Sequence, residues 1–387
     1  MKIFVIPSSY KNECNIQANI FVHEQCEQLI KRGHQVIVLD ATTRSAKHWN
    51  HRSCTSPTFR KEGVVPVYSY CVRGIAKSRL PRLATLQFRN KVKVLWDIAV
   101  ENEGMPDVIY AHFSFPSGFC ALDLAKKFNI PIATMEHGGM YFNEKIHPYI
   151  IKQLCSTVSI SDSFFCVSSS HSKRISELTN LDKNVEVVPN MISDIFSYTP
   201  LLSNDRFVFF SGGNLKPVKC FDLLVSAFCK AFDASQPVEL RIAGEGEERE
   251  KIEKLIKDNG RDRQISLLGR LDRNDMLAEY KKCNCFALAS VHESFGIVYR
   301  EAMSCGRPVI STDNGGIREG WDDSFGIIVP IGDVEALSKA MTDLYENYSD
   351  YNLQDISKKT LDYCSQSSVV NIIESKLLRI VGEKNGF

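Results

Sequence analysis

The sequence lacks any long apolar run. None of its 387 residues belongs to a stretch near the roughly 18 to 20 residues that a membrane-spanning helix needs, and the longest candidates are short pieces such as Val36–Leu39. The apolar stretch Ile3–Ile6 is too short for a signal peptide, and it runs into Pro7 as a strand runs into a loop. We therefore expect a cytoplasmic location and no membrane-spanning helix.

Several functional motifs are also missing. No Asp-x-Asp follows a predicted strand, and Asp322-Asp323 has no third ligand nearby, so we expect neither a dedicated metal ion nor a cofactor. The serine-hydrolase elbow, the Walker A loop and H-E-x-x-H do not occur. The basic segment described below contains no recognisable nucleic-acid-binding module, so nucleic acid is not an expected partner.

A disulfide framework is not expected either. The 13 cysteines are odd in number and irregularly spaced, and no export signal accompanies them, so we interpret them as reduced. Cys283 and Cys285 form a single C-x-C, which is poor evidence for zinc without a second pair. Burial as small hydrophobic residues is the better interpretation.

What the sequence does contain is typical of a folded two-domain protein. Its 44% hydrophobic and 24% charged content is that of a globular chain. A length of 387 residues exceeds the size at which one hydrophobic core stops growing, so two domains are expected.

The charge is distributed unevenly. The whole chain carries a net charge of +1, but between Ala41 and Trp96 twelve Lys and Arg residues face one acid, Glu62. Apolar residues such as Leu80, Leu83 and Leu86 alternate with these cations. This pattern suits the surface of an anionic membrane leaflet, and a solvated basic face is the alternative.

Short β-branched runs alternate with longer amphipathic stretches from the first residues. Gly33 ends the first predicted helix, Ile16–Arg32. The strands predicted in the first half are Ile3–Ile6, Gln35–Leu39, Val64–Tyr70, Val108–Ala111, Ile130–Met135, Phe164–Val167 and Val185–Val188. A parallel sheet covered by helices on both faces accommodates this alternation.

A second series of strands follows a linker-like stretch, Ser197–Asp205. Its strands are Phe207–Ser211, Val238–Ala243, Ile265–Leu268, Phe286–Ala289, Val309–Ser311 and Ile327–Val329. The sequence thus predicts two Rossmann-like doubly wound parallel-sheet domains, residues 1–197 and 203–365, with ligands bound in a central cleft at the carboxyl ends of the strands.

The most informative segment runs from His292 to Ile310. Glu293 lies in the loop after a strand, and a helix begins near Gly296, so Glu301 falls about one and a half turns into that helix. Free N–H groups and the positive dipole end of a helix suit a diphosphate. Two acids in this arrangement can accept hydrogen bonds from sugar and ribose hydroxyls.

This segment resembles the E-x7-E signature of retaining GT-B glycosyltransferases, above all glycosyltransferase family 4. The similarity extends over most of the chain, including Pro106–Phe113, Glu136–Gly138, Gly213–Lys219 and Leu268–Leu271. Each segment alone is weak evidence for the family, but their occurrence in this order along one chain is specific. The resemblance implies that the C-terminal helix, about residues 366–387, packs back on the first domain.

The resemblance also implies roles for individual residues. It makes His137, Glu293 and Lys219 catalytic, with Lys219 at the donor pyrophosphate. The donor-binding residues that it implies are Asn214, Lys219, Gly269, Arg270, Glu293, Phe295, Gly296, Ile297 and Glu301, and on the acceptor side they are Asn19, His112 and Gly138.

Three positions depart from the family pattern. Asn214 replaces a frequent arginine, and Asn19 and Cys220 stand where relatives commonly have glycine. Asn214 can donate a hydrogen bond but carries no charge, so more of the leaving-group stabilisation falls to Lys219 and the helix N-terminus. At Asn19 the side chain opposes the close approach of the backbone to the donor phosphate or acceptor that a glycine would allow.

The reaction that the resemblance implies is transfer of a hexose-type sugar from a nucleotide diphosphate sugar, UDP-sugar favoured, to a glycan or lipid-linked glycan in bacterial surface polysaccharide synthesis. Retention is implied by the family, and a front-face route is favoured because no carboxylate nucleophile is identifiable near His137 except Glu136, which belongs to the strand. The protein would then work at the inner face of the cell membrane.

Other functions remain possible on this scaffold. A dinucleotide oxidoreductase is disfavoured because Arg249 stands where G-x-G-x-x-G needs its third glycine after Gly244 and Gly246. A sugar-nucleotide epimerase or a phosphorylase on the same scaffold would lack the E-x7-E context. A non-catalytic partner subunit is the third alternative, suggested by Asn19, Asn214 and Cys220.

Overall fold

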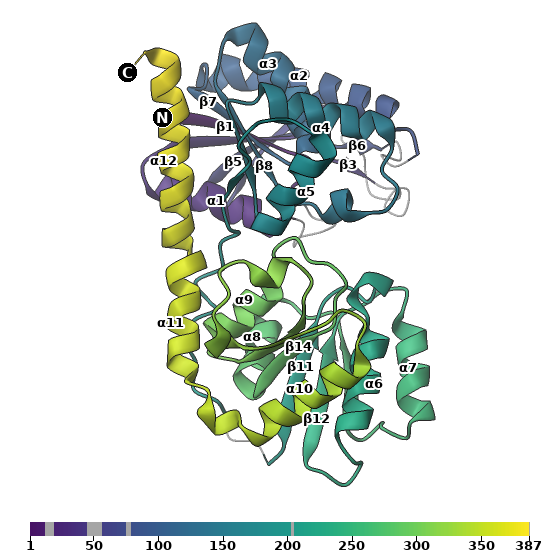
Figure 1. The fold of residues 1–387 in the computed structure, drawn as a ribbon. Helices are drawn as coiled ribbons and strands as arrows, with labels where there is room; N and C mark the ends of the chain where they lie inside the picture. The colour runs from purple at the N-terminus through teal and green to yellow at the C-terminus, as the bar shows by residue number, and fades with distance from the viewer. Residues whose placement is uncertain (12–18, 45–55, 75–78, 203–204, 387) are drawn as a thin grey trace. The chain divides into compact units, whose positions relative to one another are not determined.

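The structure is a computed structural model that describes residues 1–11, 19–44, 56–74, 79–202 and 205–386. The chain divides into two compact units (Figure 1). Unit 1 comprises Met1–Met191 together with Val369–Phe387, and unit 2 comprises Ile192–Ser368. Both units are α/β structures built on a mainly or wholly parallel sheet, which confirms the expected fold class.

Unit 1 contains an eight-stranded sheet in the order β10-β9-β8-β7-β1-β2-β5-β4. The strands are β1 (Lys2–Pro7), β2 (Gln35–Asp40), β4 (Thr58–Glu62), β5 (Val65–Ser69), β7 (Val108–His112), β8 (Ile132–Glu136), β9 (Ser163–Cys166) and β10 (Glu186–Val187). The central strands are buried along almost their whole length, as expected for a sheet covered on both faces. A separate two-stranded sheet pairs β3 (Thr43–Arg44) with β6 (Val72–Arg73).

Helices separate these strands. They are α1 (Ile20–Lys31), α2 (Pro81–Glu103), α3 (Phe119–Phe128), α4 (Pro148–Ile160) and α5 (Ser169–Thr179), with the short helices η2 (Ser114–Gly118) and η3 (Gly139–Phe142). Packing against β1 and β2, the inner face of α2 contributes Phe88, Leu95 and Trp96 to the core. Trp96 meets Phe4 edge to face at 5.3 Å between ring centroids.

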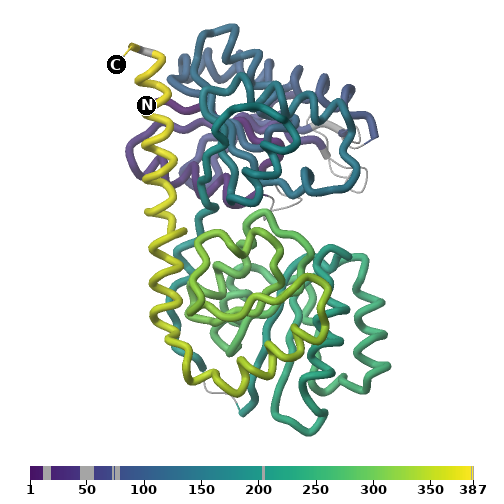
Figure 2. Tube along the Cα trace, viewed as in Figure 1, coloured from purple at the N-terminus to yellow at the C-terminus, as the bar shows by residue number. Residues whose placement is uncertain are grey.

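The C-terminal helix α12 (Gln366–Asn385) supplies residues to unit 1 from Val369 onward (Figure 2). Its Glu374 accepts from Arg32 at 2.8 Å and lies 2.8 Å from the His34 ring nitrogen Nε2. Farther along, Arg379 pairs with Glu186 at 2.8 Å. These ion pairs fix the helix to the turn after α1 and to β10.

Unit 2 contains a six-stranded, wholly parallel sheet in the order β13-β12-β11-β14-β15-β16. The strands are β11 (Phe207–Gly212), β12 (Val238–Ala243), β13 (Ile265–Gly269), β14 (Cys285–Leu288), β15 (Val309–Thr312) and β16 (Gly326–Val329). The helices are α6 (Phe221–Ala231), α7 (Arg249–Asp258), α8 (Arg273–Lys282), α9 (Ile297–Ser304), α10 (Val334–Glu346) and α11 (Leu353–Cys364), with η4 (Pro217–Lys219), η5 (Gly316–Arg318), η6 (Asp323–Phe325) and η7 (Tyr348–Asp350).

The sequence did not reveal strand β4, nor the two-residue strands β3 and β6. Strand β4 pairs antiparallel with β5 at the sheet edge, with Arg60 opposite Val67. Its Thr-Phe-Arg-Lys-Glu sequence looks like a polar loop because both faces of an exposed edge strand meet solvent. A search for apolar runs therefore does not detect β4.

Candidate active site

Each sheet has one place where the strand order reverses, and parallel α/β sheets bind ligands at such places, beyond the carboxyl ends of the strands. In unit 2 the reversal lies between β11 and β14. Lys219 follows β11, and Glu293 follows β14. In unit 1 the reversal lies between β1 and β7, and His112 is the last residue of β7.

Lys219 and Glu293 form an ion pair in unit 2. The Lys219 Nζ donates to Glu293 Oε1, and the two side chains are 19% and 12% exposed. The same carboxylate oxygen accepts from Ser290 Oγ at 2.7 Å. A cation and an acid 74 residues apart are thus held together, partly accessible, at the predicted position for a diphosphate and a sugar.

The loop that carries Glu293 is fixed by the loop after β15. Glu293 N donates to the Asn314 carbonyl at 3.1 Å, and a Cβ on Gly316 would lie 2.6 Å from the Glu293 carbonyl oxygen. Glycine is therefore required at this position by close backbone approach. Arg300, which is 1% exposed, donates to the carbonyls of the segment that contains Gly316 and Ile317.

Helix α9 begins beside this loop. Gly296 precedes it with φ 76°, and among the described residues no side chain caps its first turn. Tyr299 N donates to the Gly296 carbonyl at 3.1 Å, so the helix itself leaves the N–H groups of Ile297 and Val298 without an acceptor. Phe295 is 2% exposed and has the Arg300 guanidinium 5.4 Å from its ring centroid. Ile297, the first helical residue, is half-buried.

Glu301 lies farther along α9 and is 8% exposed. Its Oε2 accepts from the Tyr280 hydroxyl at 3.2 Å. Burial, followed by the nearby Glu301 charge, raises the pKa of Tyr280 well above its ordinary value, so the phenol keeps its proton and donates. This hydrogen bond holds the carboxylate in one position.

The remaining predicted donor residues lie at the carboxyl end of the same sheet. Asn214 is exposed in the loop after β11. Gly269 is the last residue of β13, with φ 72°, and the exposed Arg270 follows it. A Cβ on Gly244, after β12, would lie 1.9 Å from the Gly213 carbonyl oxygen, so the first glycine of the G-x-G pair serves loop packing.

Two of the departures from the family pattern fall on backbone that glycine would favour. Cys220 has φ 47° and Asn19 has φ 48°, both in the left-handed region. Asparagine tolerates this region better than cysteine does. Asn19 is further held by its Nδ2, which donates to the Ser9 carbonyl at 3.0 Å and to Ser9 Oγ at 2.6 Å.

In unit 1 the two predicted histidines form a chain with Asn190. His137 Nδ1 lies 2.9 Å from Asn190 Oδ1, and His137 Nε2 lies 3.0 Å from His112 Nδ1. The His rings stack with their centroids 5.2 Å apart, and Phe21 covers His137 at 4.5 Å. His112 is fully buried, so its side chain contacts His137 and not the surface.

Burial keeps both imidazoles neutral. Desolvation lowers the pKa of His137 to about 3 against the opposing hydrogen bond to Asn190. The pKa of His112 also falls well below its ordinary value because of burial and of the neighbouring His137. With Asn190 accepting, His137 Nδ1 carries the proton, its Nε2 accepts, and His112 Nδ1 is the donor.

Glu136 ends β8 beside these histidines and is 1% exposed. Its Oε2 accepts from the Ser114 backbone N–H at 2.7 Å, and its Oε1 accepts from Gly138 N at 2.8 Å. Desolvation raises the pKa of this carboxyl. Its oxygens are used to hold the loop that starts at His137, so it is not placed as a nucleophile.

Comparisons with known proteins identify the family. The family model described as "Glycosyltransferase Family 4" matches residues 18–194, and that described as "Glycosyl transferases group 1" matches residues 196–360. The chain belongs to these glycosyltransferases. As a family member it is a transferase, which agrees with the E-x7-E interpretation of the sequence.

The relatives carry varied names. An uncharacterized glycosyltransferase of Methanocaldococcus jannaschii is 29% identical over 64% of this chain and 68% of its own length. The GPI3 subunit of phosphatidylinositol N-acetylglucosaminyltransferase of Saccharomyces cerevisiae is 24% identical over 62% of this chain and 59% of its own. The match thus spans less than two thirds of the yeast subunit.

A solved structure shows the same fold over almost the full length. Anabaena HepE in complex with UDP superposes with a TM-score of 0.75, at 16% identity, over 98% of this chain and 100% of that one. The GT-B architecture of the glycosyltransferase is therefore supported by both sequence and structure.

The candidate site also includes side chains to which the sequence assigned no role. Ser290, Asn314 and Arg300 hold Glu293 and its supporting loop, and Asn190 orients His137. Ser290 and Asn314 each follow a predicted strand, which was an available signal. Nothing in the sequence indicated the Asn190 contact, because it joins residues 53 apart.

Other features of the described residues bear on the remaining predictions. They contain no group of three His, Cys, Asp or Glu side chains that could hold a metal ion. No helix within them is long and apolar enough to cross a bilayer. Cys283 and Cys285 are fully buried, as predicted.

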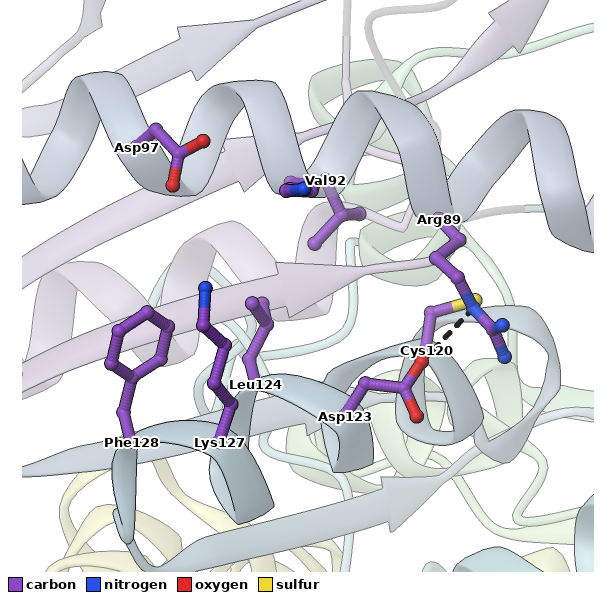
Figure 3. Close-up of a pocket in the computed structure, with 9 residues that line it drawn as sticks. Arg89, Val92, Asp97, Cys120, Asp123, Leu124, Lys127 and Phe128 are labelled. Atoms are coloured by element: carbon purple, nitrogen blue, oxygen red, sulfur yellow. Dashed lines mark ion pairs between the residues drawn. The ribbon is translucent and has the colours of Figure 1, made fainter.

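A cavity of about 180 Å³ lies between α2 and α3 (Figure 3). Arg89 and Asp123, which line it, pair with each other at 3.0 Å. Phe128 and Leu124 supply apolar lining. Because the Arg89 and Asp123 charges neutralise each other, we assign no ligand to this cavity.

Proposed function

We propose that this glycosyltransferase moves a hexose-type sugar from a nucleotide diphosphate donor to a glycan or lipid-linked glycan acceptor, with retention of configuration. The observation that carries the proposal is the Lys219–Glu293 ion pair, which lies at the strand-order reversal of unit 2. A UDP-sugar is the favoured donor because HepE, which shares the fold, was crystallised with UDP.

In this proposal unit 2 holds the donor. The diphosphate lies at the uncapped start of α9, and Lys219 neutralises it. Asn214 adds an uncharged hydrogen bond in place of an arginine. Glu301, fixed by Tyr280, accepts from the ribose hydroxyls, Glu293 accepts from the hydroxyls of the sugar, and backbone groups near Gly269 and Arg270 contact the base.

In this proposal Lys219 exchanges one anionic partner for another when the donor binds. In the structure Glu293 balances the Lys219 charge. A diphosphate offers two negative groups and takes over the lysine, which releases the Glu293 carboxylate for the sugar. Binding of the diphosphate therefore also frees the Glu293 carboxylate to accept hydrogen bonds from the sugar.

The transfer itself follows a front-face route. The acceptor oxygen bonds to the anomeric carbon as the bond from that carbon to the diphosphate breaks, and the electron pair goes to the leaving oxygen, which takes the acceptor proton. Stabilisation of this developing charge by a fixed cation and helix N–H groups is the main contribution of the protein. His137 is the residue of unit 1 proposed for the reacting centre, and Gly138, His112 and Asn19 are proposed for the acceptor side.

We propose that no metal ion takes part. Lys219 and the α9 N-terminus supply the positive charge that a divalent cation gives other sugar transferases. Transfer measured in excess EDTA should proceed at the rate measured without it. A loss of transfer that returns when Mg²⁺ or Mn²⁺ is added back would contradict this part of the proposal.

Only some of the cations in the basic segment between Ala41 and Trp96 are exposed in the structure. Arg60 pairs with Asp40 and Glu62, and Lys91 is buried and donates to backbone carbonyls. Lys47, Arg52 and Lys77 lie outside the described residues. The exposed cations that remain in the described part are Lys61 on β4 and Arg79, Arg82 and Lys93 at or on α2. Leu80, Leu83 and Leu86, which lie close along the chain to Arg79 and Arg82, are 50–53% exposed.

We propose that this surface at the start of α2 binds the cytoplasmic face of an anionic membrane, where a lipid-linked intermediate of a bacterial surface polysaccharide would be elongated. Sedimentation with vesicles of phosphatidylglycerol and phosphatidylcholine, at increasing salt, tests it. Absence of binding to these vesicles at low salt would exclude the proposal.

The proposed function as a whole is tested by donor binding and turnover. Thermal shifts with UDP, GDP, ADP and CMP sugars identify the nucleotide, and nucleotide release with acceptor present reports transfer. The Glu293→Gln variant should keep the fold and lose transfer. A chain that binds no sugar nucleotide, or binds one without hydrolysis or transfer, would instead be the non-catalytic partner subunit.

The stereochemical part needs its own measurement. NMR of the product formed from an α-linked donor should show an α-linkage. Trapping of a covalent glycosyl-enzyme with a slow donor would replace the front-face route by a double displacement.

A further inference from the structure

A second cavity in unit 1 has the composition of a lipid-binding pocket. It encloses about 400 Å³ beside η3 and the start of α4, within the size range of small-molecule sites. Its lining residues are Phe115, Met140, Asn143, Lys145, Ile146, His147 and Ile150. It lies only three residues along the chain from His137, since Met140 belongs to it.

The lining separates into an apolar interior and a polar rim. Phe115 and Ile150 are 6% and 4% exposed, and Met140 and Ile146 are half-buried against the same core. The polar residues Asn143, Lys145 and His147 are exposed. A hydrocarbon chain fits this interior better than a sugar does, because no carboxylate or buried amide lines it to accept from hydroxyl groups.

The rim carries the charge that an anionic head group needs. Lys145 is exposed at this rim. His147 Nδ1 accepts from Tyr149 N at 3.1 Å and caps α4, which leaves Nε2 as the ring nitrogen that can donate to a ligand. The neighbouring acid, Glu144, is exposed and does not line the cavity.

The cavity also adjoins the surface proposed to meet the membrane. The Arg82 guanidinium lies over the Tyr149 ring at 5.5 Å, and Gln153 donates to Thr85 Oγ1 at 3.3 Å, so the first turns of α2 pack on α4. Leu86 follows Arg82 by one turn on the exposed face of α2. A lipid leaving the bilayer at these leucines would meet Arg82 and then the rim of the cavity.

We propose that this cavity binds the apolar chain of a lipid phosphate, with the phosphate at Lys145 and His147, and so selects a lipid-linked acceptor. The inference rests on the proposed function and makes its acceptor specific. In this proposal the hydrocarbon tail of the lipid binds in unit 1, and this binding needs no contact with the donor.

Isothermal titration of the full chain with decyl phosphate, below its micelle concentration, tests the proposal. Decyl phosphate should bind the wild type, whereas decanol and inorganic phosphate should bind at least about tenfold more weakly because each lacks half of the recognised groups. Equal binding of decanol would exclude the phosphate site, and equal binding of phosphate would exclude the apolar cavity.

Variants locate the binding. Ile150→Trp, which fills the interior, and Lys145→Glu, which reverses the rim charge, should each weaken decyl phosphate binding at least about tenfold. Lys126→Glu, an equal charge reversal on α3, should not. Met140→Trp fills the cavity from a half-buried position and replaces Ile150→Trp if that variant does not fold.

Controls separate this inference from the proposed function. Every variant should keep its thermal shift with the donor nucleotide and, if Ile150→Trp folds, its binding to phosphatidylglycerol vesicles. A wild type that binds the nucleotide but not decyl phosphate, or cavity variants that bind decyl phosphate as the wild type does, would overturn the inference alone. A wild type that binds decyl phosphate but no sugar nucleotide would overturn the proposed function and leave the lipid phosphate site in place.

Discussion

The two units place their candidate residues at the same topological position and give them opposite electrostatic character. In unit 2, Lys219 and Glu293 are charged, paired and partly exposed. In unit 1, His112 and His137 are neutral, and both lie deep in the protein. The difference teaches that one fold supplies either a charged site or a neutral one according to how far the residues after its strands are removed from water.

The largest expected effect falls on the charged site. Lys219→Ala should reduce transfer at least about 100-fold, because it removes the cation that stabilises the leaving diphosphate. The matched control is Lys230→Ala, which breaks an exposed ion pair with Glu335 in the same unit. We expect little change there. Equal losses in both variants, measured as nucleotide release, would show that the Lys219 effect is not specific to the site.

The neutral site should make unit 1 sensitive to acid. The pKa of His137 is about 3 in the folded state and about 6.5 when unfolded, so between these values the unfolded chain binds the extra proton. Stability is complete above about pH 6.5 and should be lost as the pH falls, by about 1 kcal/mol per pH unit for this histidine. Urea denaturation at neutral and mildly acidic pH, followed by hydrogen exchange in β7 and β8, measures it.

His137→Asn is the comparison for that measurement. Asparagine can still bond Asn190 but takes up no proton, so the acid-dependent loss of stability should become smaller. His112 remains in this variant, and its own lowered pKa leaves part of the dependence in place. A variant with the same pH dependence as the wild type would mean that His137 is not held neutral by burial.

The two left-handed positions allow a test with opposite signs. Cys220→Gly should stabilise unit 2 by about 1 kcal/mol, because glycine adopts φ 47° without the Cβ penalty. Asn19→Gly should destabilise unit 1 by about 1 kcal/mol, because asparagine tolerates the conformation and the variant loses the bonds to Ser9. Unit-resolved hydrogen exchange in urea distinguishes the two. Stabilisation by both substitutions would show that the Ser9 contacts contribute little.

The smallest expected effect concerns Asn214. Replacing it with arginine adds a cation to the exposed loop after β11, and donor nucleotide affinity should rise about threefold, since exposed charges gain little in water. Titration calorimetry with UDP measures the change. Asn214→Gln lengthens the side chain without adding charge and should leave affinity unchanged. A similar gain in both variants would indicate that reach, and not charge, limits this position.

Much of the fold was predictable from local pattern. Every strand named from the sequence occurs, with ends that differ by at most two residues, because fully buried parallel strands such as β7 consist of continuous apolar runs. Strand β4 was missed, since its pairing with β5 depends on an edge and not on its own composition. The start of the first predicted helix, at Ile16, lies outside the described residues.

The candidate site was predictable to the level of residue identity and strand end. Glu293, Glu301 and Lys219 stand after β14, within α9 and after β11, as the motif spacing indicated. Their partners were not predictable. The Ser290 and Lys219 bonds to Glu293, and the bond of His137 to Asn190, depend on which loops meet at a sheet edge, and loops distant in sequence carry no local signal of that meeting.

The sequence by itself determined the two parallel sheets, the family, and which residues follow the strand ends, because hydrophobic period and motif spacing are local properties of a chain. Only the tertiary structure decided that Lys219 is balanced by Glu293, that His112 is buried behind His137, and that an apolar cavity opens beside α4. Burial and pairing are set by the packing of distant segments, and these govern charge and pKa.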